Sequence, residues 1–480
     1  MKLAYLAAFL LSLVVALPMH AAELFQAGAA MSNITPPLGL EIVGGFVPYP
    51  AKHIHDELHA RCLVLDDGQT KLAIVVCDLL GIHRAVSEEA RKMIAEKSGI
   101  TREQVLISAT HTHSAASALG KNRLAHEQTL DEYQQFVAQR IADGVARALH
   151  NCRPAKIAFG KVEVPEHVFN RRWHMKPGTA PVNPFGMVEQ VKMNPPGGSP
   201  NLIEPAGPTD PNISFISVCE PSGRPISVFA TYSLHYVGGV GKDDISADYY
   251  GVCCEHLKQL LTAGEKREQA VDSPPFVALL ANGTSGDINN INFVKPRASK
   301  KPYEQIRYVA EDVATKIHAA LKDVKYQDHV SLGAVYREPT LKWRRPTEEE
   351  KKWATETIAA GPKSKSDLSF IYAERAMKLA EYPETTTVPL QLLRVGDVCL
   401  GTMPCEIFCE IGLEFKSRSP LPNSYLVSLA HGYFGYLPTP RQHRLGGYET
   451  WIGTNRLEPT ASDKLLAQLL QMAAELQAKN

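Results

Sequence analysis

Residues 106–117, LISATHTHSAAS, place two histidines at the end of an apolar run. The preceding residues QVLISAT predict a short buried β-strand. Alternate side chains of an extended strand share a face, so an extended chain would put His111 and His113 side by side. Open α/β sheets carry their sites at the carboxyl ends of strands. The pair therefore indicates a site for metal binding or proton transfer, although surface and hydrogen-bonded core pairs have the same spacing.

Strand and helix patterns alternate on both sides of this stretch. Residues 60–80 predict two strands joined at Asp66-Asp67-Gly68, and residues 86–98 and 131–150 have helical periodicity. Further segments continue the alternation: strands at 213–220, 225–237, 276–284 and 388–404, and helices from 247, at 303–321 and at 461–476. This order predicts an α/β protein in which sheets and helices form layers.

Two segments depart from the alternation. Residues 173–212 are dense in proline and glycine, which predicts a long loop acting as a lid or pocket wall, or else a surface wrap. Residues 346–383 are charged and helical, which predicts an inserted helical hairpin.

Composition limits the class of protein. Lys plus Arg and Asp plus Glu are both 51 in 480 residues, so no net positive charge favours a nucleic-acid partner. The nine cysteines include no CxxC pair, which disfavours a thiolate zinc site. We expect one catalytic domain over residues 23–480.

The first 22 residues have the pattern of a signal peptide. Lys2 precedes the apolar run LAYLAAFLLSLVVAL, and MHAA supplies small residues for cleavage near Ala21 or Ala22. We therefore expect an exported protein, periplasmic or secreted, with no transmembrane anchor after the signal is removed.

Other candidate site residues lie far from the histidine pair in sequence. His235 follows FATYSL, and Glu406 follows LGTMPC, so each comes just after an expected strand. Two histidines and a carboxylate in such positions form the donor set of a catalytic zinc.

Six motifs in collinear order resemble the catalytic domain of the neutral/alkaline non-lysosomal ceramidase family. SATHTHSAA is the most specific, and the others are MSNITPPLG, FNRR, GTSGDINN, MPCEIF, and YFGYLPT followed by YET. The resemblance implies a zinc-dependent hydrolase that cleaves an amide or ester-type carbonyl bond with zinc-activated water.

The resemblance also implies roles for individual residues. One zinc per chain would be bound by His111, His235, Glu406 and Tyr436. His113 would face the substrate and protonate the leaving group. Arg171 and Tyr448 would stabilise the oxygen of the carbonyl as it gains charge.

The chain departs from the family pattern in ways that affect the substrate. Asn289 occupies the position of a family serine that binds a substrate hydroxyl or acts as nucleophile; Asn289 would serve only in substrate binding, and Ser285 is displaced from that position. The family's C-terminal β-sandwich domain is not expected here. The substrate is thus a small molecule or a lipid, with two alternatives to an amide hydrolase: a lactone or ester hydrolase acting on a small polar substrate, and an inactive zinc-binding protein that binds a ligand.

Overall fold

The computed structural model describes residues 25–121, 123–264 and 273–478. The expected signal peptide, residues 1–22, lies outside these residues. Within the described ranges, no helix has both the length and the apolar content that a membrane crossing needs.

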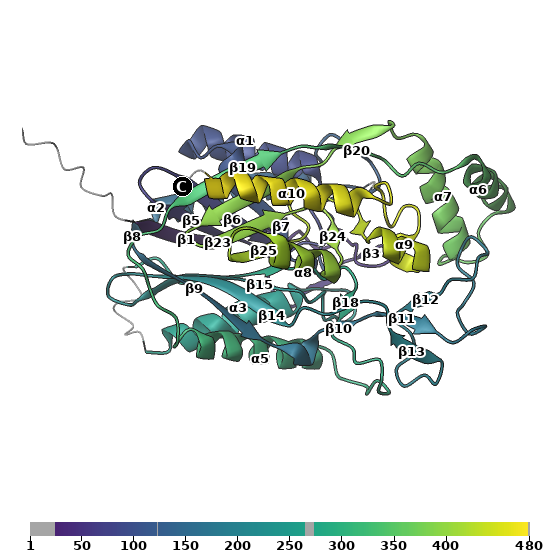
Figure 1. Cartoon of the computed structure of the whole chain (residues 1–480), viewed down its shortest axis with the longest axis horizontal. Helices are drawn as coiled ribbons and strands as arrows, with labels where there is room; N and C mark the ends of the chain where they lie inside the picture. Colours follow the sequence, from purple (N-terminus) through teal and green to yellow (C-terminus); the bar gives the residue numbers. More distant parts are fainter. Residues whose placement is uncertain (1–24, 122, 265–272, 479–480) are drawn as a thin grey trace, which may run out of the picture.

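Three β-sheets form the centre of the molecule (Figure 1). The first has the order β7-β6-β5-β1-β8, the second β17-β15-β14-β9, and the third β19-β22-β23-β25. Strands of the first sheet are β1 (Gln26–Asn33), β5 (His59–Asp66), β6 (Lys71–Cys77), β7 (Val105–Ala109) and β8 (Arg153–Pro154). Strands of the second are β9 (Lys156–Glu163), β14 (Asn212–Cys219), β15 (Pro225–Tyr232) and β17 (Val277–Asn282). Strands of the third are β19 (Leu332–Arg337), β22 (Leu390–Val395), β23 (Val398–Thr402) and β25 (Asn423–Val427).

Each sheet turns one apolar face to a shared core and the other to helices. Leu65 of the first sheet, Leu279 of the second and Leu400 of the third belong to one buried cluster. Helices α1 (Arg84–Ser98) and α2 (Glu132–His150) cover the first sheet, α3 (Asp248–Thr262) and α5 (Glu304–Ala320) the second, and α8 (Cys409–Arg418) and α10 (Ala461–Ala478) the third (Figure 1). The predicted α/β layered class is confirmed.

The segment at 173–212 is more ordered than its composition predicts. It forms a small sheet in which β11 (Arg172–Met175) lies between β12 (Val191–Met193) and β13 (Leu202–Pro205). Apart from Pro205 in the edge strand β13, the prolines and glycines of this segment lie outside the short strands, where no ladder hydrogen bond is required of them. The segment predicted as a long loop therefore contains three short strands joined by turns.

The helical hairpin predicted at 346–383 is present as α6 (Glu348–Ala360) and α7 (Leu368–Ala380). Thr347 caps α6 by accepting the Glu350 N–H, and Asp367 caps α7. Buried Ala373 and Ala376 pack α7 against the core of the third sheet.

Carboxyl ends of parallel strands from all three sheets meet at one place. β7 pairs parallel with β6, β15 with β17, and β23 with β25. The Asn282 side chain at the end of β17 donates to the Thr110 carbonyl beyond β7, and the Ser428 N–H beyond β25 donates to the Asn282 carbonyl. These bonds join the three sheets beside the histidine pair.

Candidate metal and catalytic site

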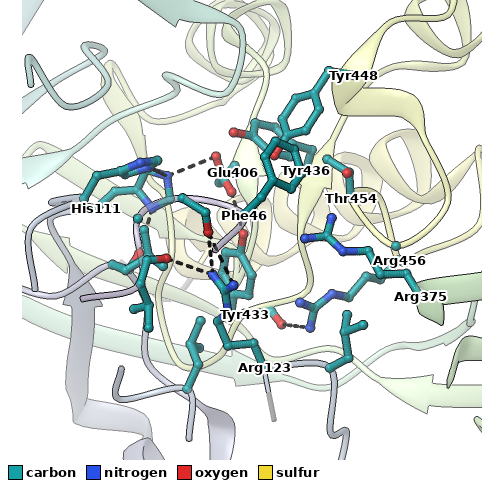
Figure 2. Close-up of a pocket in the computed structure, with 18 of the residues that line it drawn as sticks. Phe46, His111, Arg123, Arg375, Glu406, Tyr433, Tyr436, Tyr448, Thr454 and Arg456 are labelled. Carbon is teal, nitrogen blue, oxygen red and sulfur yellow. Dashed lines mark hydrogen bonds and ion pairs between the residues drawn. The ribbon is translucent and has the colours of Figure 1, made fainter. Parts of the chain in front are cut away.

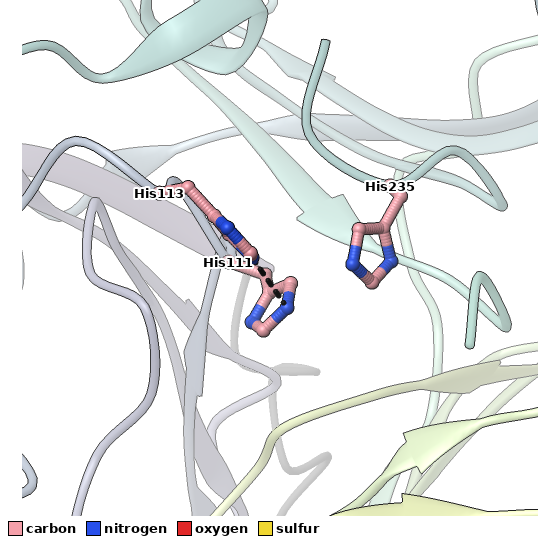
Figure 3. Close-up of side chains that lie close together, drawn as sticks. All are labelled: His111, His113 and His235. Atoms are coloured by element: carbon pink, nitrogen blue, oxygen red, sulfur yellow. Dashed lines mark hydrogen bonds between the residues drawn. The ribbon is translucent and has the colours of Figure 1, made fainter. Parts of the chain in front are cut away.

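The histidine pair lies beyond the strand, not on it. β7 ends at Ala109, and His111 has a left-handed backbone with φ 74°. The His111 N–H donates to the Leu79 carbonyl at 2.9 Å, which holds this uncommon conformation in place. The two rings nevertheless meet, with 3.2 Å between their Nε2 atoms (Figure 3). The sequence therefore predicted correctly that the two histidines are neighbours. The cause is the left-handed backbone at His111 and not the alternation of an extended strand.

Backbone carbonyls orient two of the imidazoles. His111 Nδ1 lies 2.7 Å from the Leu80 carbonyl, and His235 Nδ1 lies 3.1 Å from the Ser285 carbonyl. A carbonyl only accepts, so the proton of each neutral ring is on Nδ1 and Nε2 carries an unprotonated lone pair. This arrangement is typical of metal-binding histidines.

Glu406 and Tyr436 are neighbours because two short strands pair in register. β24 (Glu406–Ile407) runs parallel to β26 (Tyr436–Leu437), with Glu406 opposite Tyr436. Glu406 Oε2 lies 3.2 Å from His111 Nε2 and 3.7 Å from His235 Nε2. Four residues from distant parts of the chain are thus brought to one point.

Two of the converging atoms lack a hydrogen-bond partner within the described part of the chain. These atoms, Glu406 Oε2 and His235 Nε2, are buried, and each residue is at most 3% exposed. Leaving such atoms unpaired is costly unless another group satisfies them. Histidine nitrogens and a carboxylate oxygen are ligands that zinc prefers, so the residues present are suited to binding a zinc ion.

Electrostatics around Glu406 favour its charged form. Burial acts to raise its pKa, but His111 and hydrogen bonds from Tyr436 and Tyr433 outweigh burial and hold the pKa below its usual value. Tyr436 behaves in the opposite way, because burial raises its pKa well above the usual value despite the nearby Arg171. In the protein alone Tyr436 is a neutral phenol, and it would have to lose its proton to bind a metal as phenolate.

Arg171 is fixed beside Tyr436. Its Nη2 donates to the Tyr436 hydroxyl at 3.0 Å, and its Nε donates to Glu449 at 2.9 Å. The neighbouring Arg172 donates to the other oxygen of Glu449 at 2.7 Å. The completely buried Glu449 therefore holds both guanidinium groups in place.

His113 is the most accessible of the three histidines. The three rings offer nitrogens that all lie within 4.8 Å of one another, so His113 is itself within reach of a metal. Its ring stacks on Tyr236 with 3.7 Å between centroids. Burial, followed by the neighbouring His111 and Arg171, lowers the pKa of His113 well below its usual value.

A cavity of about 700 Å³ opens onto these groups (Figure 2). His111, His113, His235, Glu406, Arg171, Tyr436 and Tyr448 all line it. The Tyr448 ring stands 5.7 Å from that of Tyr436, and burial raises its pKa to about 12. Seven of the eight site residues expected from sequence thus share one cavity.

Asn289 is the exception, because its side chain does not line the cavity and instead contacts a residue that does. Its Nδ2 donates to Asn194 Oδ1 at 3.2 Å, and Asn194 lines the cavity. Ser285 is also outside the lining: its hydroxyl donates to Asn282 at 2.7 Å and lies 3.3 Å from His235 Nδ1. Ser285 thus supports His235 and does not face the cavity.

Sequence reasoning gave no role to several residues of this site. Tyr433 donates to Glu406 Oε1 at 2.7 Å, and Tyr236 stacks on His113. Tyr433 stands in the YFGYLPT motif and Tyr236 directly follows His235, so proximity to a motif was the one available signal.

Comparison with known proteins connects the geometry to a family. Residues 25–302 match the family described as neutral/alkaline non-lysosomal ceramidase, N-terminal. The neutral ceramidase of Mycobacterium tuberculosis is 20% identical over 492 aligned positions, which cover 88% of this chain and 71% of that protein.

Two solved structures share the fold. The neutral ceramidase from Pseudomonas aeruginosa matches with a TM-score of 0.66 and 16% identity, over 95% of this chain and 75% of that one. A structure described as "Ceramidase complexed with C2" matches with a TM-score of 0.69 and 17% identity, over 95% and 76% of the two chains.

Proposed function

The chain belongs to the neutral/alkaline non-lysosomal ceramidase family, and from that premise we propose that it is an exported, zinc-dependent hydrolase of an amide or ester-type carbonyl bond. The supporting observation is the pair of buried, unpartnered atoms, Glu406 Oε2 and His235 Nε2, that face His111. We assign the metal ligands as His111, His235, Glu406 and Tyr436. Residues 23–480 are assigned to one catalytic domain.

When bound, zinc supplies a Lewis acid that polarises a carbonyl and lowers the pKa of a coordinated water to about 7. Arg171 and Tyr448 donate hydrogen bonds to the substrate oxygen as it becomes negative, with Arg171 held in place by Glu449. His113, whose lowered pKa makes it a neutral imidazole, would accept the proton that the attacking water loses and deliver it to the leaving nitrogen or oxygen. Asn289 acts on the substrate indirectly, by orienting Asn194.

The proposed substrate is more polar than ceramide. A site built to hydrogen-bond a hydroxyl discriminates strongly, and Asn289 replaces the serine expected at that position. An amide, an ester or a lactone with polar substituents is therefore favoured.

A hydrolysis screen tests the proposal. Zinc-loaded protein is assayed against N-acyl sphingosines, N-acyl amino acids, simple esters and lactones, before and after chelation. We expect turnover of at least one class, loss on chelation and recovery with zinc. Glu406→Gln should reduce turnover by about 100-fold or more, whereas Glu414→Gln on the exposed face of α8 should not. Full activity after complete chelation, or no activity on any class, would contradict the proposal.

A further inference from the structure

Three arginines gather on the wall of the cavity away from His111 (Figure 2). Arg123 lies in the long connection between β7 and α2. Arg375 belongs to α7 of the inserted hairpin, and Arg456 lies in the connection that leads to α10. We call Arg123, Arg375 and Arg456 the arginine cluster. Its members come from separate segments, so their meeting results from the tertiary fold.

The positive charge of the cluster is not neutralised by the protein. Among the residues that the structure describes, Arg123 donates only to the carbonyls of Val43 and Gly45, and Arg375 lies over the faces of Phe46 and Tyr372. Among the described residues, none of the three arginines forms an ion pair with a carboxylate. By contrast, Arg171 in the same cavity is paired with Glu449.

Arg456 provides the clearest sign of a missing partner. It is only 7% exposed, and its buried Nε has no hydrogen-bond partner in the described ranges of the chain. Its one described side-chain donation, to the Tyr433 carbonyl, is long at 3.4 Å. A buried guanidinium normally has its donors satisfied, preferably by a carboxylate or a phosphate.

Mutual repulsion within the cluster agrees with this geometry. Burial lowers the pKa of Arg123, and the adjacent Arg375 and Arg456 lower it further. The two acidic groups of the lining do not offset this charge: Glu406 is engaged by His111 and Tyr433, and Glu374 is exposed and forms no ion pair within the described part of the chain.

The cluster lies within reach of a small substrate at the candidate metal site. The Tyr433 ring connects the two, because its hydroxyl donates to Glu406 while Arg456 covers its face at 5.1 Å from the ring centre. Leu80, Leu119 and Ile371 add apolar surface to the same cavity. A molecule with a short carbon chain and one anionic group matches this lining.

We propose that the arginine cluster binds an oxyanion of the substrate, so that the enzyme hydrolyses a carboxylate-bearing or phosphate-bearing amide or ester in preference to an uncharged lipid. This inference rests on the proposed hydrolase function. It specifies the substrate class of the same site.

Pairs of substrates that differ in the presence of one anionic group test the inference. One pair is N-octanoylglycine and N-octanoylglycinamide; the second is the phosphate ester of N-octanoylethanolamine and its uncharged parent. For the wild type, kcat/KM should be about tenfold or more higher for the anionic member of at least one pair, which corresponds to about 1.4 kcal/mol. The pair with the larger ratio identifies the oxyanion.

Variants then assign the preference to the cluster. Arg375→Gln and Arg456→Gln should each bring the ratio close to unity, and Arg375→Lys should retain part of it. Lys352→Gln removes one positive charge from the exposed side of the same hairpin and should leave the ratio unchanged. Equal kcat/KM within both pairs, or a ratio that survives both glutamine substitutions in folded protein, would overturn the inference while the hydrolase proposal stands.

A binding measurement separates this inference from failure of the hydrolase proposal. If no substrate is turned over, calorimetry with N-octanoylglycine and with the phosphate ester on the full chain still reports on the cluster. Binding that weakens about tenfold in Arg375→Gln supports the anion site without hydrolysis. No binding of either anion, or binding equal to that of the uncharged partner, overturns it.

Discussion

The His113 ring stacks on Tyr236 and also has a backbone hydrogen-bond partner, Gly44. Backbone carbonyl groups likewise fix Nδ1 of His111 and His235. We predict that His113→Asn keeps its zinc while hydrolysis falls by about 10²- to 10⁴-fold, because only proton transfer is lost. Elemental analysis and steady-state kinetics on the same sample decide this. Loss of the metal from His113→Asn would instead make His113 a ligand.

Tyr448 is proposed to donate to the substrate oxygen without binding the metal. Tyr448→Phe removes that donor and keeps the ring against Phe46 and Tyr436. We predict a fall in kcat of about 100- to 1000-fold with little change in KM or zinc content. Tyr308→Phe, at an exposed position on α5, is the matched control. A rise in KM with kcat unchanged would show that Tyr448 binds the ground state and the transition state equally.

Ser285 lies near the site but faces away from the cavity. In Ser285→Ala the Ser285 backbone carbonyl remains to orient His235, so we predict that most activity is retained. Intact mass spectrometry after mixing with substrate should show no acyl adduct. An adduct on Ser285 would contradict the water-based mechanism.

Expected strand ends and the family resemblance together predicted the candidate metal ligands, but neither gave a role to Tyr433 or Arg375. His111, His235 and Glu406 follow expected strands, Tyr436 came from the resemblance, and the structure brings the four together. Arg375 belongs to a charged amphipathic helix, where an arginine ordinarily faces solvent. Only the tertiary position of α7 turns it into the cavity.

At the scale of elements, the connection between β2 (Glu41–Ile42) and β3 (Tyr49–Pro50) packs directly against His113. A Cβ at Gly44 would lie 2.2 Å from the His113 carbonyl, whereas one at Gly45 would meet only the Val47 carbonyl, at 3.9 Å. We predict that Gly44→Ala displaces His113 and lowers kcat, while Gly45→Ala has little effect. Kinetics of the two variants at equal zinc content provide the comparison. Equal activities of the two variants would show that the connection between β2 and β3 accommodates the added methyl group without displacing His113.

Element types were predicted better than the geometry at their ends. Periodicity predicted α2, α5 and the α6–α7 hairpin, because long amphipathic patterns are unambiguous. It could not predict the left-handed backbone at His111, which depends on the Leu79 carbonyl of a different segment. It also missed the sheet of β11, β12 and β13, whose strands of three or four residues carry too few positions to show alternation.

At the scale of the whole molecule, the proposed zinc connects segments that follow strands of all three sheets. His111 follows β7, His235 follows β15, and Glu406 follows β23, so no single sheet contains the complete donor set. We propose that these segments meet in order to bind one metal ion.

Zinc content of the purified, dialysed full chain tests that claim most directly. We predict one zinc per chain in the wild type and in His329→Ala, a control at an exposed position, and close to none in His235→Ala. Circular dichroism establishes that each variant is folded. A full equivalent of zinc in folded His235→Ala, or no zinc in a wild type exposed to excess zinc before dialysis, would contradict the account.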